Sequence, residues 1–199
     1  MCDQSGESKR LADESEEGLE VHLGRHPPNL VLIGFMGAGK TSVGRVCARR
    51  LQFRFADTDL LIERMADKTI AQVFEEDGEE QFRRLEQIAV ARISRRCGIV
   101  IATGGGVILN PANVHNLRRN GVVIWLQTQT EEALRRVGDR SSRPLLSEAE
   151  DPAQRFEQLL AKRWPFYLRA ADYRLDSTGL RVSEAAERVI ALYRKGIGL

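Results

Sequence analysis

The chain has 199 residues, 42% of them hydrophobic, which is enough to bury one substantial core. Its 30 basic and 28 acidic residues give a formal net charge of +2, and so even a balance gives no electrostatic reason to bind nucleic acid or a membrane surface. No apolar run approaches the roughly 20 residues of a membrane-spanning helix. The 3 cysteines lack CxxC spacing, which indicates neither a zinc site nor a disulfide framework and fits a reducing cytoplasm.

The N-terminal stretch, residues 1–28, differs from the rest of the chain in composition. It is rich in Ser, Glu and Asp and has few large apolar residues, which predicts a disordered tail. It lacks the apolar core of a secretory signal and is too acidic for a typical organelle transit peptide. We therefore expect a tail that Pro27 and Pro28 close, followed by a single domain over residues 29–199.

From Asn29 onward, short apolar runs alternate with helical stretches, which predicts a parallel sheet covered by helices on both faces. Strands buried in this way should be continuously apolar, and the expected strands are 30–33, 99–102 and 122–126, with weaker candidates at 53–56 and 173–175. Helical periodicity predicts helices over 40–51, 58–66, 69–96, 130–137, 152–169 and 183–195, and Asn110-Pro111 begins another. Gly78 should interrupt the stretch 69–96, and the polar residues 138–151 form a loop of a length that is usually functional.

The segment from Gly34 to Thr41 matches the P-loop pattern G-x-x-x-x-G-K-[ST] in full. An apolar strand precedes it and an amphipathic helix follows it, which is the context that the motif requires and which an incidental glycine-rich turn would lack. The glycines let backbone N–H groups point at phosphate oxygens, and the helix start adds a positive dipole end. We expect Lys40 to reach the β- and γ-phosphates and the Thr41 hydroxyl to bind Mg²⁺.

Two carboxylates, Asp57 and Asp59, stand at the end of the second predicted strand. Ligands of doubly wound sheets bind beyond the carboxyl ends of the strands. The two residues can therefore divide the work, one facing a metal ion and the other an acceptor hydroxyl. A helix N-cap with acidic first-turn residues is the alternative interpretation.

Three glycines, Gly104, Gly105 and Gly106, follow the third apolar strand. Without side chains there, backbone N–H groups can approach a ligand closely, although a tight strand exit would explain the same residues. Many P-loop proteins carry an acidic metal-binding residue at this position. Its absence here suggests that Asp57 takes that role.

Three arginines, Arg83, Arg143 and Arg163, stand where they could face the same cleft. A guanidinium binds two oxygens of a carboxylate or phosphate at once, which suits such a site. Each arginine is weak evidence by itself, because single arginines are usually solvated.

Taken together, the segments GFMGAGKTSVGR, FADTD, VFEEDGEEQFRRLE, ATGGGV, RPLL and KRWPFY resemble the shikimate kinases, and the resemblance covers Asn29 to about Tyr193. It implies a fold like the nucleoside monophosphate kinases: an α/β P-loop three-layer sandwich with a five-stranded parallel sheet. It also implies a shikimate-binding segment at about 58–96 and a lid at about 138–151. The implied reaction transfers the γ-phosphoryl group of ATP to the 3-hydroxyl of shikimate, in aromatic amino-acid biosynthesis, with Mg²⁺ and in a monomer.

The same resemblance implies a role for each matching residue. Lys40, Asp59 and Arg143 would be catalytic, and Thr41 and Asp57 would hold Mg²⁺, Asp57 directly or through water. The ATP-binding residues would be Gly37, Ala38, Gly39, Lys40, Thr41, Ser42 and Arg143. The shikimate-binding residues would be Asp59, Arg83, Gly104, Gly105, Gly106 and Arg163. Either Arg136 or Arg140 would lie near the adenine, and the spacing does not choose between them.

Two other functions fit part of this pattern. A related small-metabolite kinase, for gluconate or a nucleotide, would share the P-loop and the fold. The pair Arg83 and Arg163, combined with DTD and TGGG, favours shikimate instead. A P-loop binding module without catalysis is the third reading, and the intact catalytic positions argue against it.

Overall fold

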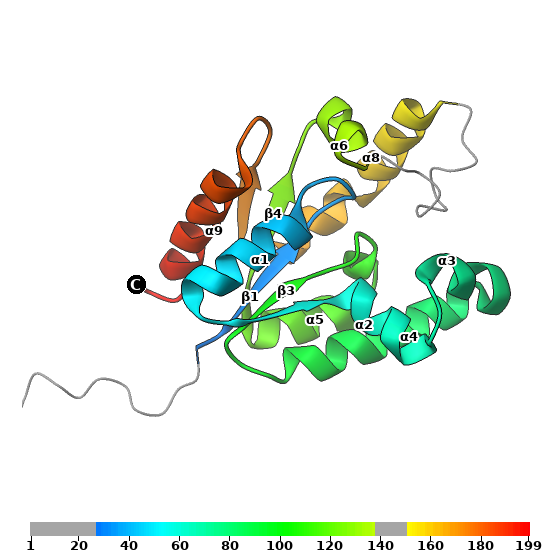
Figure 1. The fold of residues 1–199 in the computed structure, drawn as a ribbon, viewed down its shortest axis with the longest axis horizontal. Coiled ribbons are helices and arrows are strands. Elements are labelled where there is room, and N and C mark those ends of the chain that lie inside the picture. The colour runs from blue at the N-terminus through cyan, green and yellow to red at the C-terminus, as the bar shows by residue number, and fades with distance from the viewer. Residues whose placement is uncertain (1–26, 138–150) are drawn as a thin grey trace, which may run out of the picture.

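The computed structural model describes residues 27–137 and 151–199, which form a three-layer domain around one parallel sheet (Figure 1). The five strands lie in the order β2-β3-β1-β4-β5. Their bounds are β1 Asn29–Ile33, β2 Arg54–Asp57, β3 Ile99–Ala102, β4 Gly121–Gln127 and β5 Tyr173–Asp176. The helices are α1 Lys40–Leu51, α2 Thr58–Ala66, α3 Ile70–Gln72, α4 Gly78–Ser94, α5 Pro111–Arg119, α6 Thr130–Val137, α8 Pro152–Ala170 and α9 Val182–Gly196. The expected five-stranded parallel sheet is thus confirmed.

Alternate residues of the central strands point to the two faces of the sheet, and each face is covered by helices (Figure 1). Leu30 and Leu32 of β1 pack in a cluster with residues of α1 and α9. Val31 and Ile33 of the same strand pack in the opposite cluster, with residues of α4, α5 and α8. Burial on both faces explains why these strands are continuously apolar in the sequence.

The stretch 69–96 differs from a single interrupted helix. It consists of α3, a π-helical turn η1 (Val73–Asp77) and α4, and α4 begins at Gly78, whose φ of 82° suits glycine. Lys68 binds the end of the turn, with Nζ 2.9 Å from Oδ1 of Asp77 and 3.0 Å from Oε2 of Glu76. These elements pack on a small apolar cluster of their own, made of Ile62, Val73, Phe82 and Ala89.

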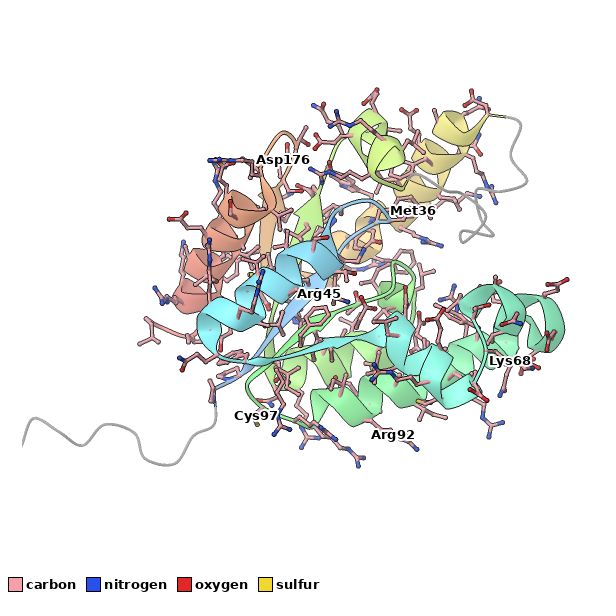
Figure 2. The ribbon with its side chains drawn as sticks, in the orientation of Figure 1. Met36, Arg45, Lys68, Arg92, Cys97 and Asp176 are labelled. Carbon is pink, nitrogen blue, oxygen red and sulfur yellow. The ribbon has the colours of Figure 1, made fainter. Side chains whose placement is uncertain are left out.

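All strands are parallel, so their carboxyl ends meet at one edge of the sheet. The P-loop follows β1 there, Asp57 ends β2, and the glycine loop, residues 103–106, follows β3. Figure 2 shows Met36 of the P-loop near this edge, whereas Cys97, which precedes β3, lies at the other end of the sheet. The sheet therefore gathers the predicted site segments in one place.

Candidate active site

The P-loop joins the end of β1 to the start of α1, as its motif predicts. Gly39 at the N-cap of α1 makes no side-chain capping bond to the first-turn N–H groups. Such a helix start attracts anions, because its N–H groups and its dipole are both positive. The Lys40 ammonium donates to the Phe35 carbonyl of the loop at 2.9 Å. The loop and α1 thus form an anion site of the kind that phosphates occupy.

Asp57 connects the P-loop to the start of α2. Its Oδ2 accepts a hydrogen bond from the Thr41 hydroxyl at 2.8 Å, and its Oδ1 accepts from the Asp59 N–H at 3.0 Å. Asp57 is therefore the N-cap of α2, as the alternative interpretation of the sequence has it, and it also lies beside the P-loop. Two hard oxygen donors side by side, next to an anion site, suit Mg²⁺, which usually takes one or two protein oxygens together with substrate phosphates.

The glycine loop is pressed against side chains from two other segments. The Gly104 N–H donates to the Thr58 hydroxyl at 2.8 Å, which holds the loop against the start of α2. A Cβ added at Gly104 would lie 2.5 Å from Oδ1 of Asp59, and one added at Gly106 would lie 2.5 Å from Nη1 of Arg83. Both distances are too short for non-bonded atoms. Glycine at these positions is what allows the Asp59 carboxylate and the Arg83 guanidinium to sit against the loop.

Arg163 and Tyr167 of α8 bind the same loop through the Gly105 carbonyl. The Tyr167 hydroxyl donates to this oxygen at 2.8 Å, and Nη1 of Arg163 donates to it at 3.5 Å. Tyr167 is fully buried and stacks on Trp125, with the ring centroids 5.1 Å apart. Arg163 is 8% exposed and lies over the Phe35 ring of the P-loop, at 5.2 Å from its centroid. This arginine therefore contacts both the P-loop and the glycine loop.

A second charged residue on α4, the buried Glu86, forms an ion pair with Arg83. Its side chain is 2% exposed, and both carboxylate oxygens lie 3.2 Å from Nη1 of Arg83. Burial raises the pKa of Glu86 above its ordinary value, while the charge of Arg83 opposes that rise and the charge of Asp59 adds to it. The sequence reasoning missed Glu86. The available signal was a glutamate on the same helical face as Phe82 and Ala89, where an apolar residue is expected.

On the other side of the P-loop, α6 carries an arginine that contacts both the P-loop and the loop after β5. Arg136 donates from Nη1 to the Gly37 carbonyl and from Nη2 to the Ser177 carbonyl, each at 3.5 Å. Glu132 forms an ion pair with Arg136 and accepts from the Gly179 N–H at 2.9 Å. These bonds tie α6 to the P-loop and to the loop after β5.

Some predicted site residues lie outside the part of the chain that the structure describes. These are Arg143, Arg140 and residues 138–150 of the expected lid, together with residues 1–26 of the expected tail. The remaining predicted positions, from Gly37 to Arg163, are described. Asp59, Arg83 and Arg163 all lie against the glycine loop.

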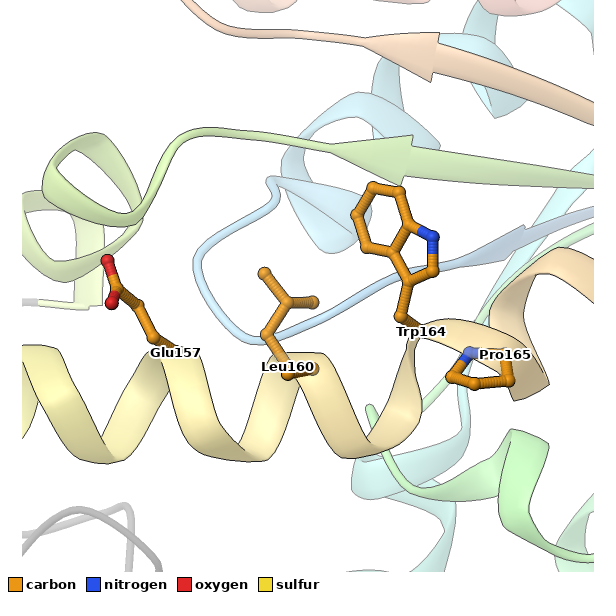
Figure 3. Close-up of a pocket in the computed structure, with 5 residues that line it drawn as sticks. Glu157, Leu160, Trp164 and Pro165 are labelled. Carbon is orange, nitrogen blue, oxygen red and sulfur yellow. The ribbon is translucent and has the colours of Figure 1, made fainter.

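A hollow of about 450 Å³ opens along α8, lined by Glu157, Leu160, Ala161, Trp164 and Pro165 (Figure 3). Trp164 points from α8 toward β4, where its ring meets that of Trp125 edge-on at 4.6 Å between centroids. The lining is apolar except for Glu157, which does not suit the phosphates of a nucleotide or the carboxylate of a small acid. This hollow is therefore a poor match for either ligand, unlike the anion site at the P-loop.

The fold and the site define a P-loop kinase: an anion site for a donor phosphate, a carboxylate beside it and two arginines that suit an anionic acceptor. A family model described as "Shikimate kinase" matches residues 36–194. The chain belongs to the shikimate kinase family, and it is thus an ATP-dependent kinase that phosphorylates shikimate.

Individual relatives agree with this membership. A shikimate kinase of Caldanaerobacter subterraneus subsp. tengcongensis is 51% identical over 84% of this chain and 96% of its own length. A shikimate kinase of Thermoanaerobacter pseudethanolicus is 48% identical over 83% of this chain and 95% of its own length. Among solved structures, a shikimate kinase from Acinetobacter baumannii in complex with shikimate superposes with a TM-score of 0.82 at 37% identity, covering 85% of this chain and 94% of that one.

The gluconate alternative is represented among the solved structures as well. A gluconokinase from Sinorhizobium meliloti 1021 superposes with a TM-score of 0.53 at 16% identity. A likeness at this identity reflects the shared fold alone. The comparisons therefore place the chain with the shikimate kinases, as the DTD, TGGG and arginine pattern predicts.

Proposed function

We propose that this chain transfers the γ-phosphoryl group of ATP to the 3-hydroxyl of shikimate at the sheet edge where the P-loop and the glycine loop lie next to each other. The observation that carries the proposal is the meeting of Asp59, Arg83 and Arg163 around Gly104–Gly106, next to the P-loop. Shikimate carries one carboxylate and three hydroxyls. Two arginines suit its carboxylate, and an aspartate with a bare backbone loop suits its hydroxyls.

The donor half of the proposed site is the P-loop. We assign the phosphates of ATP to the N–H groups of residues 37–42 and to the Lys40 ammonium, which neutralises charge on the β- and γ-phosphates. Arg136 would lie at the base end of the nucleotide, because the acceptor residues occupy the β2–β3 side of the P-loop and Arg136 lies on the β4–β5 side. Arg143, assigned to the phosphates from the sequence, stays a prediction.

Thr41 and Asp57 would hold the Mg²⁺ that accompanies ATP. Mg²⁺ usually takes one or two protein oxygens together with substrate phosphates, which the adjacent Thr41 hydroxyl and Asp57 carboxylate can supply. When bound, Mg²⁺ neutralises charge on the transferring phosphoryl group.

Asp59 would act on the acceptor hydroxyl. An ionised carboxylate beside the glycine loop can orient the 3-hydroxyl toward the γ-phosphate and accept its proton as the new P–O bond forms. Arg83 and Arg163 would hold the acceptor carboxylate and so fix the ring in a single orientation. Phosphoryl transfer depends mainly on such positioning and on charge neutralisation.

The cellular location and the oligomeric state are assigned from general features of the chain. Within residues 27–137 and 151–199, none of the helices has the length and apolarity to cross a bilayer. We place the enzyme in the cytoplasm, because its three thiols lack a disulfide pattern and its substrates are metabolites. We assign it as a monomer by resemblance to its family.

A coupled ADP-release assay with shikimate, gluconate and nucleoside monophosphates tests the proposal. We expect ADP release that depends on shikimate and on Mg²⁺. The variant Asp59→Asn should lose turnover by about two to four orders of magnitude, the usual contribution of general acid–base catalysis, while it still binds ATP. Near-normal turnover of the variant would remove Asp59 from this role, and turnover of gluconate instead of shikimate would overturn the acceptor assignment.

A further inference from the structure

The guanidinium of Arg83 is occupied by two carboxylates of its own helix. Both oxygens of Glu86 lie 3.2 Å from Nη1, and Oε1 of Glu79 lies 3.2 Å from Nε and 3.0 Å from Nη2. A carboxylate ligand binds arginine best along an edge that offers two N–H groups. Glu79 holds the Nε–Nη2 edge, so an incoming acceptor carboxylate and Glu79 compete for the same donors.

The two glutamates differ in how firmly they are held. The Glu86 side chain is 2% exposed, whereas that of Glu79 is 65% exposed. Moving the buried Glu86 away would leave a charge unpaired in the interior, which is strongly unfavourable. Glu79 loses only a weak, solvated ion pair when it turns to solvent. Glu79 is therefore the partner that can be exchanged.

The charge of Glu79 also reaches the second arginine of the site. Burial lowers the pKa of Arg163, and the charge of Arg83 lowers it as well, while Glu86 and Glu79 act in the opposite direction. Two neighbouring cations, one of them largely buried, repel each other in the free enzyme. Glu79 offsets that repulsion when the acceptor is absent.

We propose that Glu79 is an internal substitute for the acceptor carboxylate: it occupies Arg83 in the free enzyme, yields it when the acceptor binds, and takes it back when the product leaves. The inference rests on the proposed function, since it assumes that Arg83 binds the acceptor carboxylate. The phosphorylated product keeps that carboxylate, so its release must break the same contact. Glu79 thus weakens the hold on substrate and product alike and adjusts acceptor affinity without touching the reacting atoms.

The test compares Glu79→Gln with Glu80→Gln in the full chain. Both residues are exposed and stand in the first turn of α4, so both variants remove the same charge at the same helix end. We expect Glu79→Gln to lower the KM for shikimate about two- to five-fold, the range of an exposed ion pair, and to strengthen inhibition by the product to a similar degree. Glu80→Gln should leave both quantities within about 1.5-fold of the parent.

A second acceptor separates competition from a structural effect. The carboxamide of shikimate cannot displace Glu79 from Arg83, so its KM should change no more in Glu79→Gln than in Glu80→Gln. The preference for acid over amide should therefore grow in Glu79→Gln only. A raised or unchanged KM for shikimate in Glu79→Gln would overturn the proposal, because Glu79 would then orient Arg83 rather than compete for it. Failure of the parent enzyme to turn over shikimate would contradict the proposed function instead.

Discussion

Replacing the buried Glu86 by glutamine should separate acceptor binding from stability. The change removes a carboxylate whose two oxygens lie 3.2 Å from Nη1 of Arg83, and the guanidinium would keep the exposed Glu79 as an ionic partner. Hydrogen bonds to charged groups contribute about 1.5–3 kcal/mol. If the orientation of Arg83 loses this much stabilisation, the free energy of acceptor binding should weaken by a similar amount. The KM for shikimate should then rise about 10- to 100-fold, since about 1.4 kcal/mol is a factor of ten.

The free energy of unfolding should respond differently. Burial raises the pKa of Glu86 above its ordinary value of 4.5 in spite of Arg83, so the ionised form is disfavoured in the folded state. A neutral glutamine avoids the cost of burying a charge, and the partly exposed Arg83 keeps Glu79 as a partner, so we expect the variant to be as stable as the parent, or more stable, at pH 8. The sign follows from proton linkage. Between 4.5 and the raised pKa the folded parent binds more protons than the unfolded parent, so Glu86 contributes stability below 4.5 that is lost as the pH rises.

Thermal unfolding at pH 5 and pH 8 and shikimate kinetics at pH 8 measure both effects. The melting temperature of the parent relative to the Glu86→Gln variant should be higher at pH 5 than at pH 8. The reasoning is refuted if the variant is destabilised equally at both pH values, or if its KM for shikimate stays at the parent value. The former would mean that Glu86 acts as a structural ion pair, and the latter that Arg83 needs no support.

Two further substitutions probe the glycine loop. Tyr167→Phe removes the hydroxyl that donates to the Gly105 carbonyl and keeps the stacking on Trp125; we expect a loss of about 1–3 kcal/mol in urea unfolding and a higher acceptor KM. Unchanged values in both measurements would show that Arg163 alone holds the carbonyl. Gly104→Ala places a Cβ 2.5 Å from the Asp59 carboxylate; turnover of shikimate should fall at least about ten-fold, as misplacement of a reacting group implies, while nucleotide binding measured by titration persists. Loss of nucleotide binding as well would mean that the loop change spreads to the P-loop.

Much of the fold could be predicted because its strands are buried on both faces. The runs at 30–33, 99–102 and 122–126 all form strands, and they occupy the three central positions of the sheet. The π-helical turn at 73–77 could not be predicted. Lys68 contacts Glu76 and Asp77 at its end, eight and nine residues away, and helical periodicity does not register such contacts.

The candidate site divides in the same way. Asp59, Arg83 and Arg163 could be singled out because their motifs have a recognisable order, and the structure brings all three to one loop. Glu86 and Tyr167 were not singled out, for different reasons. Glu86 left a signal, because it is a charged residue in an apolar helical face three residues from Arg83. Tyr167 left none, because the partner of its hydroxyl is 62 residues distant in the chain, and a sequence pattern does not encode such a contact.

The glycine loop has a consequence for redesign of the enzyme toward other acceptors. The side chains of Asp59 and Arg83 fill the space that a Cβ at Gly104 or Gly106 would need, so these two positions have no room for a side chain. Directed evolution for a bulkier or uncharged acid should therefore find few tolerated changes at Gly104 and Gly106. Variation would accumulate instead in the side chains that face the loop, and a shorter residue in place of Arg83 would be the first step that opens space beside Gly106.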